Sequence, residues 1–382
     1  MRTTTLIKYC CLCVSVLVIL AGCSAIRLSS PLVQSENDWS MTGRNPAHTH
    51  YTKSDSLTFP MSIAWKYDAS AGFGASAVTI VDGILFVGTL QGEYHAVDAL
   101  TGKRIGYKKL SSPIGGAAVT DQNRAYLGLE GGKESFMAID LMENRTEWTA
   151  SLGGIDSSPL LFGGKLYVGS ITGILYCLTP TRGEEVWKFE TKGAIHSSPA
   201  AVDSLIIFGN DNGVVYAVQA TNGSMVWQYQ TNAALFGSAM IAGGVVFVGS
   251  RDHYLYALDV RRGTLRWKYD AGDRIVACPS GNDSLVFIGA LNGTFAALRQ
   301  SDGTPVWRFT ASSVINSSAV VTQSAVFVGS LNTEIYALSP TSGAVMWKYK
   351  LESRIKTSPV VWNSFLYVAA EDRSIYCFRP GK

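Results

Sequence analysis

The stretch GEEVWKFETKGAIHSSPAAV (183–202) returns four more times along the chain. The later copies begin with the same glycine and read GSMVWQYQTNAALFGSAM, GTLRWKYDAGDRIVACPS, GTPVWRFTASSVINSSAV and GAVMWKYKLESRIKTSPV. Their tryptophans lie 40 residues apart, at Trp187, Trp227, Trp267, Trp307 and Trp347. A fixed period of about 40 residues is typical of proteins built from repeated structural units.

Each period contains four short strands and no helical pattern. In one copy the apolar or alternating segments are SSPLLF (157–162), KLYVGS (165–170), ILYCL (174–178) and EEVWKFE (184–190). Glycine and threonine turns separate these segments, as expected for antiparallel strands joined by tight turns. Four strands per 40 residues, repeated radially, predict the blades of a β-propeller.

The number of blades follows from the two ends of the repeat. The sequence segment expected to form the innermost strand of a blade occurs eight times. Its copies are centred at Phe73, Ile114, Ile155, Ile195, Leu235, Ile275, Ile315 and Ile355. One outer strand, SIAWKYDA (62–69), comes before the first of them, and only three strands follow the last. These fragments are complementary. The sequence therefore predicts an all-β, eight-bladed propeller closed by one N-terminal and three C-terminal strands, which leaves no open end to the array.

One repeat departs from the pattern in its outer strand. Trp148 lies 39 residues before Trp187, but the preceding repeat has Gly106 where the tryptophan is expected, with Tyr107 beside it. An earlier tryptophan, Trp65, lies in the N-terminal strand. Recurrence in the same strand of the other repeats indicates that these tryptophans pack between blades.

The N-terminus has the features of a lipoprotein signal. Arg2 and Lys8 precede an apolar run that ends in LAGC (20–23), which resembles the lipobox of bacterial lipoproteins. We expect a signal peptide over 1–22, lipidation of Cys23, a polar tether over 23–37 that reaches roughly 50 Å, and the propeller over 38–382. An uncleaved anchor or an ordinary secretory signal is the alternative.

Composition and charge narrow the range of partners. The chain has 382 residues, 32 basic and 29 acidic. Loss of 1–22 would remove two basic residues and no acid, which leaves a nearly neutral protein. This balance argues against nucleic acid as a partner. A lipid anchor places the chain in the cell envelope, and Ser24 after the cysteine resembles the outer-membrane signal of Gram-negative lipoproteins, facing the periplasm.

Two further motifs connect the repeat to a known family. The segments AVDALTG (96–102), AIDLMEN (138–144) and ALDVRRG (257–263), each followed by an aromatic strand, resemble the repeat of the pyrroloquinoline quinone (PQQ)-like propellers. DWSMTGRNPAHTHY (38–51) is similar to the segment that opens many bacterial proteins of this kind. The resemblance implies one of two branches: the PQQ-dependent dehydrogenases, or the lipoprotein subunit of the outer-membrane β-barrel assembly machinery.

The dehydrogenase branch implies residues that this sequence does not match. Its members use calcium ligands and a catalytic acid, and the alcohol dehydrogenases also have long inserts and two adjacent cysteines. After Cys23 the chain has no adjacent cysteines, and its repeats are nearly free of insertions. We therefore expect no catalytic residue, no metal site and no cofactor, and the chain is predicted not to be an enzyme. A PQQ-binding quinoprotein or redox accessory protein is the alternative.

One position of the innermost strand varies from repeat to repeat. It is occupied by Gly74, Gly115, Asp156, His196, Phe236, Val276, Asn316 and Lys356. One such position per blade forms a ring around the propeller axis. The polar members and two neighbouring arginines are our candidate binding residues, namely Asp156, His196, Arg274, Asn316, Arg354 and Lys356. A solvated rim without a ligand is the alternative interpretation.

The sequence thus favours a membrane-anchored, non-catalytic propeller scaffold that binds a protein or peptide partner. The resemblance implies outer-membrane protein assembly as the setting in which the partner acts.

Overall fold

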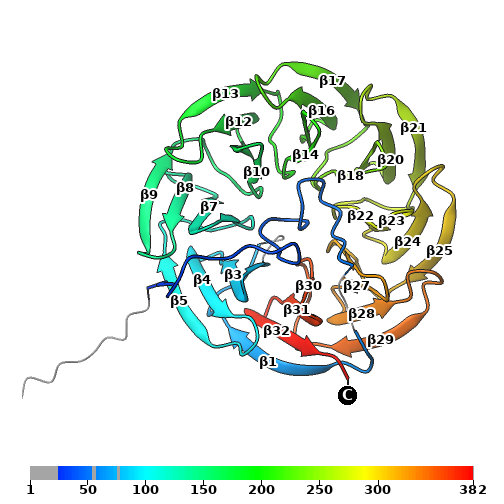
Figure 1. The fold of residues 1–382 in the computed structure, drawn as a ribbon. Helices are drawn as coiled ribbons and strands as arrows, with labels where there is room; N and C mark the ends of the chain where they lie inside the picture. The colour runs from blue at the N-terminus through cyan, green and yellow to red at the C-terminus, as the bar shows by residue number, and fades with distance from the viewer. Residues whose placement is uncertain (1–24, 54–56, 75–77, 382) are drawn as a thin grey trace, which may run out of the picture.

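The computed structural model describes residues 25–53, 57–74 and 78–381, which contain 32 β-strands and no helix. The strands form eight antiparallel four-stranded sheets, arranged as blades around one axis (Figure 1). The predicted all-β, eight-bladed propeller is confirmed. The described residues include no helix long and apolar enough to cross a membrane.

Blades 1 to 7 each use four consecutive strands, ordered from the axis outward. Blade 1 contains β2 (Val78–Val81), β3 (Ile84–Gly88), β4 (Glu93–Asp98) and β5 (Arg104–Lys109); blade 2 contains β6 (Val119–Asp121), β7 (Arg124–Gly128), β8 (Phe136–Asp140) and β9 (Arg145–Ala150). Blade 3 contains β10 (Leu160–Phe162), β11 (Lys165–Gly169), β12 (Ile174–Leu178) and β13 (Glu185–Glu190); blade 4 contains β14 (Ala200–Val202), β15 (Leu205–Gly209), β16 (Val214–Gln219) and β17 (Met225–Gln230).

The second half of the ring repeats this arrangement. Blade 5 contains β18 (Met240–Ala242), β19 (Val245–Gly249), β20 (Tyr254–Asp259) and β21 (Leu265–Asp270); blade 6 contains β22 (Ser280–Gly281), β23 (Leu285–Gly289), β24 (Thr294–Arg299) and β25 (Pro305–Thr310). Blade 7 contains β26 (Val320–Val321), β27 (Val326–Gly329), β28 (Glu334–Leu338) and β29 (Val345–Lys350).

Blade 8 closes the ring with strands from both ends of the chain. It contains β30 (Val360–Trp362), β31 (Phe365–Ala369), β32 (Ser374–Arg379) and, outermost, β1 (Ser62–Asp68). β1 and β32 pair antiparallel, with Trp65 opposite Cys377. The predicted closure by one N-terminal and three C-terminal strands is therefore confirmed.

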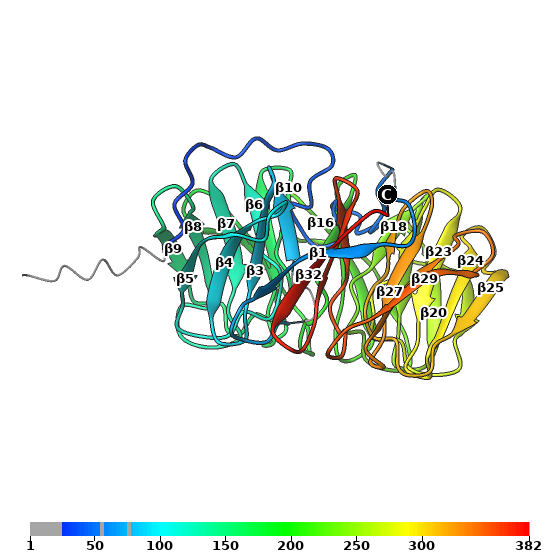
Figure 2. The ribbon, with the colours of Figure 1, turned by 90° about the horizontal axis from the view of Figure 1, so that it is seen from below.

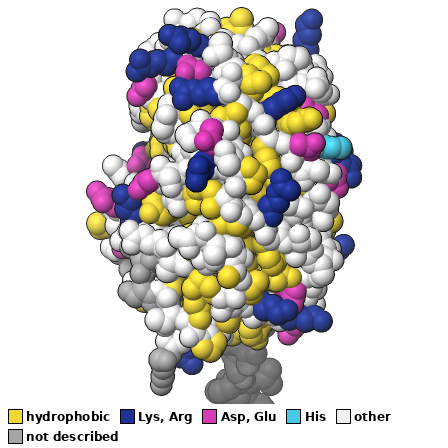
Figure 3. Space-filling model, turned by 90° about the vertical axis from the view of Figure 1, so that its right-hand side faces the viewer, with side chains coloured by type: hydrophobic (Ala, Val, Ile, Leu, Met, Phe, Trp, Pro, Cys, Tyr) yellow, Lys and Arg dark blue, Asp and Glu magenta, His cyan; other side chains and the backbone are white. Residues whose placement is uncertain are grey.

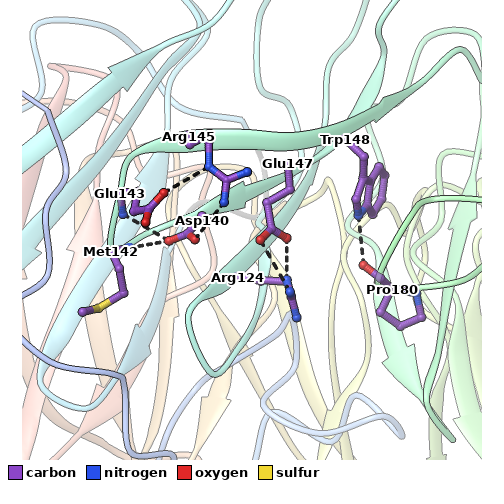
Figure 4. A network of polar contacts seen from close by, with 8 residues as sticks. All are labelled: Arg124, Asp140, Met142, Glu143, Arg145, Glu147, Trp148 and Pro180. Carbon is purple, nitrogen blue, oxygen red and sulfur yellow. Dashed lines mark hydrogen bonds and ion pairs between the residues drawn. The ribbon is translucent and has the colours of Figure 1, made fainter.

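The recurrent tryptophans join a blade to the next in every blade but blade 1, where Gly106 takes their place. Trp227 pairs in register with Ala217, and its indole N–H donates to the carbonyl of Val260 in blade 5 at 2.9 Å. A Cβ on Gly263, which has a φ of +67°, would lie 2.5 Å from the same ring, so this turn needs glycine. In blade 2 the indole of Trp148 donates in the same way to Pro180 of blade 3 (Figure 4).

A belt of serine side chains links the innermost strands around the axis. The backbone N–H of Ser158 donates to Oγ of Ser198 at 2.9 Å, and that of Ser198 donates to Oγ of Ser238 at 2.8 Å. The same contact joins other neighbouring blades, through the pairs Ala117–Ser158 and Cys278–Ser318, and Sγ of Cys278 replaces the hydroxyl as acceptor for the N–H of Ser238. Each hydroxyl therefore satisfies a buried amide of the preceding blade.

An N-terminal segment, which we call the strap (residues 38–52), crosses one face of the ring (Figures 1 and 2). Its backbone makes hydrogen bonds with the innermost strands of six blades, through the pairs Trp39–Ile80, Ser40–Thr120, Pro46–Ala201, Ala47–Ile241, Thr49–Gly281 and His50–Val321. Trp39 also donates its indole N–H to the carbonyl of Val361 in blade 8. The strap therefore covers one end of the central channel.

The predicted signal peptide (1–22) and Cys23 lie outside the described residues. The described part of the segment expected to be a tether, 25–37, packs against the propeller. Ile26, Leu28 and Leu32 are buried in the core shared by blades 1 and 2. Three apolar side chains in a mostly polar stretch explain this contact, because their burial stabilises the docked segment.

Candidate functional site

The end of the channel opposite the strap opens into a cavity, which we call the mouth. In each blade the chain runs from the variable ring into the innermost strand and towards the strap; in blade 5, for example, it runs from Phe236 to Ile241, which bonds to the strap. The cavity has a volume of about 470 Å³, within the range of about 300–1,000 Å³ common for ligand sites. Its wall contains Phe73, Gly74, Gly115, Glu130, Asp156, His196, Phe236, Val276, Asn316 and Lys356.

Four of the six candidate residues lie in the wall of the mouth: Asp156, His196, Asn316 and Lys356. The two arginines do not. Arg274 lies 3.6 Å from Asp273 of its own loop, and Arg354 pairs with Glu371. The sequence placed these arginines near the ring, but position alone does not determine where a long side chain points.

An acidic cluster occupies the side of the mouth formed by blades 2 to 4. Nδ1 of His196 lies 2.5 Å from Oδ2 of Asp156, and Nε2 lies 3.2 Å from Oδ2 of Asp211. The hydrogen bond to Asp156 raises the pKa of His196, although burial opposes the shift. Burial, and then the charge of Asp156, also raise the pKa of Glu130. This side of the mouth therefore attracts hydrogen-bond donors and cations.

Three buried oxygens at the mouth have no hydrogen-bond partner among the described residues: Oδ1 of Asp156, Oδ1 of Asp211 and Oδ1 of Asn316. Buried acceptors without partners are costly. Of these residues, Asp156 and Asn316 line the cavity.

An aromatic ring separates the acidic side from an arginine. The ring centroids of His196 and Phe236 are 5.1 Å apart, and the guanidinium of Arg251 lies 5.2 Å from the centroid of Phe236 on the same blade. This packing restricts the orientation of the histidine.

Basic side chains lie on the blade 8 side of the mouth. Lys356 forms an ion pair with Oε1 of Glu371, and Nε of Arg354 lies 2.5 Å from Oε2 of the same carboxylate. Burial opposes ionisation of Glu371, but the hydrogen bonds from Lys356 and Arg354 outweigh it and lower the pKa of this carboxyl. The mouth is thus polarised, with acids on blades 2 to 4 and cations on blade 8.

Three acidic residues near the mouth were not among the candidates predicted from the sequence. A second variable position of the repeat marks them. Glu130, Asp211 and Glu371 each lie two residues after the end of the second strand of a blade, where other repeats have leucine, isoleucine or arginine. The backbone N–H at this position donates to a carbonyl in the loop just before the variable position of the innermost strand. In blade 8, for example, the N–H of Glu371 donates to the carbonyl of Arg354. The two variable positions are therefore adjacent, and comparing the repeats at both would have found these acids.

The residues of the mouth do not fit a calcium-bound quinone. Within the described ranges, no three His, Cys, Asp or Glu side chains come together in a metal-binding arrangement. Asp156 and Asp211 share one histidine, and Glu371 is held by two cations. These carboxylates are engaged by protein groups rather than arranged as a set of calcium ligands.

Comparisons with known proteins point in two directions. The family described as "Outer membrane protein assembly factor BamB" matches residues 62–155, 138–239, 211–320 and 292–379. A crystal structure of BamB from Moraxella catarrhalis has a TM-score of 0.72 at 16% identity, over 84% of this chain and 100% of that chain. A crystal structure of quinohemoprotein alcohol dehydrogenase from Comamonas testosteroni has a TM-score of 0.77 at 14% identity, over 91% of this chain and 82% of that chain.

A curated relative by sequence is also this dehydrogenase. It is 24% identical over 182 residues, which span 40% of this chain and 25% of the enzyme's length. The prediction that the chain is not an enzyme, which rested on sequence features missing from the repeats, is therefore wrong. The lack of long inserts and adjacent cysteines does not separate this chain from the quinoprotein dehydrogenases.

Proposed function

Since the chain belongs to the family of outer membrane protein assembly factor BamB, we propose that it is a scaffold that binds a protein or peptide partner during outer-membrane protein assembly. The family match, which extends over residues 62–379, carries this proposal. The fold supports it, because a rigid ring with variable side chains at one mouth can change its partner without disturbing blade packing.

The partner contacts the open face of the propeller at the mouth. The strap covers the opposite end of the channel, and the mouth collects polar side chains from five blades, namely Glu130, Asp156, His196, Asn316 and Lys356. Arg274 and Arg354 lie just outside the wall and extend the contact surface. Charged groups at such a surface contribute mainly to orientation and specificity.

The propeller is held in the cell envelope by a lipid on Cys23, on the outer membrane and facing the periplasm if the host is Gram-negative. The L-A-G-C sequence after an apolar run supports this. The change Cys23→Ala should leave an unlipidated precursor, visible by mass spectrometry and by loss from the membrane fraction. A processed, membrane-bound variant would contradict the anchor.

Crosslinking tests the partner. The combined change His196→Ala, Arg354→Ala and Lys356→Ala should fold normally and lose partner recovery from membranes. A matched control, His253→Ala, Arg262→Ala and Lys348→Ala, removes the same residue types away from the mouth and should retain the partner. Equal recovery from both variants would contradict a role for the mouth.

We propose further that partner binding needs neither PQQ nor a metal ion, because Asp156 and Asp211 are paired with His196 and Glu371 with Lys356. The purified protein should show no bound-quinone absorbance after incubation with PQQ and Ca²⁺. Bound quinone, together with dye-linked alcohol oxidation, would instead favour a quinoprotein dehydrogenase or a redox accessory protein.

A further inference from the structure

The described chain begins in a groove on the outer rim, between blades 1 and 2. A Cβ on Gly106 in β5 would lie 2.4 Å from the carbonyl oxygen of Ala25. Ile26 is fully buried, and the N–H of Leu28 donates to the carbonyl of Leu141 at 3.2 Å. The N-terminal segment therefore occupies the space that a tryptophan fills in other blades, and its first described residue lies beside β5 (Figure 1).

The strand at this point is strongly basic. Residues 103–109, which we call the basic strand, contain Lys103, Arg104, Lys108 and Lys109 and no acid. Lys103, Arg104 and Lys109 are exposed. Glu93, 3.5 Å from Nζ of Lys109, is the one ion-pair partner of the basic strand within the described ranges. The rim of blade 1 therefore carries a net positive charge.

The neighbouring surfaces lack such an excess. On blade 2, Arg124 pairs with Glu147, and Arg145 pairs with Asp140 and Glu143, so the charges cancel locally (Figure 4). The opposite side of the ring, with blades 5 to 7, shows cationic and anionic side chains interspersed (Figure 3). Blade 2 thus lacks the positive excess of the basic strand, whereas residues 261–268 of blade 5 also contain four cations and no acid, of which Arg266 pairs with Asp259.

We propose that the basic strand on the rim of blade 1 is a docking surface for a membrane rich in anionic lipid. The proposal rests on the lipid anchor at Cys23. Only two residues of chain advance separate Cys23 from Ala25, a reach of about 7 Å, so a lipid there holds this rim against the headgroups. The exposed Arg27 adds a further cation.

Stable membrane attachment requires two signals, such as an acyl anchor and a basic patch. A lipid on Cys23 and the basic strand would supply these two signals. Exposed lysine and arginine gain about 1 kcal/mol each near an anionic surface, and the gain is screened by salt. Docking by the rim sets the propeller axis parallel to the membrane plane. The mouth then opens sideways, accessible to a partner on the same membrane.

Vesicle sedimentation tests the surface without the lipid. The full chain carrying Cys23→Ala is compared on phosphatidylglycerol and phosphatidylcholine vesicles at low and high salt. It should bind the anionic vesicles more tightly, and the difference should shrink with salt. Adding Lys103→Gln, Arg104→Gln and Lys109→Gln should weaken binding to anionic vesicles on the order of 100-fold, at about fivefold per charge, with little change on neutral vesicles.

The control removes three cations elsewhere, through Arg261→Gln, Arg262→Gln and Lys350→Gln. It should stay within about threefold of the parent, whereas equal losses in both variants would overturn the proposal by showing that only net charge matters. Equal binding of the parent to both vesicle types would overturn it as well. Thermal unfolding verifies that each variant is folded. Mass spectrometry of Cys23 tests the anchor separately, so failure of the anchor and failure of the basic strand are distinguishable.

Discussion

One histidine at the mouth connects two blades through two carboxylates. His196 of blade 4 contacts Asp156 of blade 3 and Asp211 of its own blade. Because the hydrogen bond to Asp156 strengthens when the imidazole is charged, protonation of His196 tightens the blade 3–blade 4 contact. The contact between blades 3 and 4 at the mouth is therefore sensitive to pH.

The stability of the protein should depend on pH through this contact. The pKa of His196 is raised in the folded protein above its ordinary value of 6.5, so the stabilisation is fully present below about pH 6.5 and is lost as the pH rises through the folded pKa. His196→Gln should therefore destabilise more at about pH 5.5 than at about pH 9. Urea unfolding of both proteins at the two pH values measures this, and an equal difference at both would contradict it.

A single hydroxyl of the serine belt should also be measurable. Ser198→Ala leaves the buried N–H of Ser158 without its acceptor, which costs about 1–3 kcal/mol of unfolding free energy. Ser342→Ala, on an exposed turn, is the control and should change stability by less than about 0.5 kcal/mol. Denaturant unfolding compares the two, and similar values would show that the belt contributes little.

At the scale of elements, a missing side chain is replaced by a segment far away in sequence. Blade 1 has Gly106 opposite Ala96, where the other complete blades have a tryptophan opposite alanine or cysteine. Ile26 of the N-terminal segment fills this space. The outer groove of blade 1 therefore depends on a segment that is not part of any strand.

Restoring a side chain at this glycine should release the segment. In Gly106→Ala the new Cβ meets the carbonyl of Ala25, so residues 25–28 must move, and the released backbone at the exposed Arg27 can then enter the active site of trypsin. We expect cleavage after Arg27 to accelerate at least about tenfold, which corresponds to about 1.4 kcal/mol of local destabilisation. Gly131→Ala, where the nearest atom to a Cβ is 3.9 Å away, should leave cleavage unchanged. Mass spectrometry of the fragments measures both, and unchanged cleavage in Gly106→Ala would show that the segment tolerates the methyl group.

At the scale of the whole molecule, the ring is closed twice. β1 completes blade 8 at the outer edge, and the strap connects the innermost strands at the axis. Both devices lie between residues 38 and 68, although the strands they join extend to residue 379.

Deletion of residues 38–70 should open the ring, because it removes the strap and β1 together. The exposed edge of β32 would then be free to pair with another chain, and apolar surface at the axis would be uncovered. We expect a lower melting temperature and oligomers or aggregates in size-exclusion chromatography. A monomer with the melting temperature of the parent would contradict the closure.

The fold could be predicted from the sequence because each blade has the same packing requirements, which leave the same residues in each repeat. Trp227 needs a small partner in its own blade and a glycine in the next, and these needs recur every 40 residues. The strap could not be predicted in the same way. The strap binds the blades through backbone carbonyls, such as those of Pro46 and Ala47. Because every residue has a backbone carbonyl, these contacts leave no pattern in the sequence.

The candidate site was predicted in part, for a related reason. Asp156 and Lys356 were found because they differ from the repeat at a position facing the axis. Asp211 was missed because it lies in a loop that reads as an ordinary turn, and Arg354, expected beside the ring, pairs with Glu371 and does not line the cavity.

The pairing of β1 with β32 also orders events in time. About 300 residues separate the two strands, and at roughly 5–20 residues per second their synthesis takes on the order of 15–60 s. During this interval β1 has no partner strand, because its neighbour in the described sheet, β32, has not yet been made. Closure of the ring is therefore a late step of folding, and any factor that shields β1 in the meantime should raise the yield of native protein.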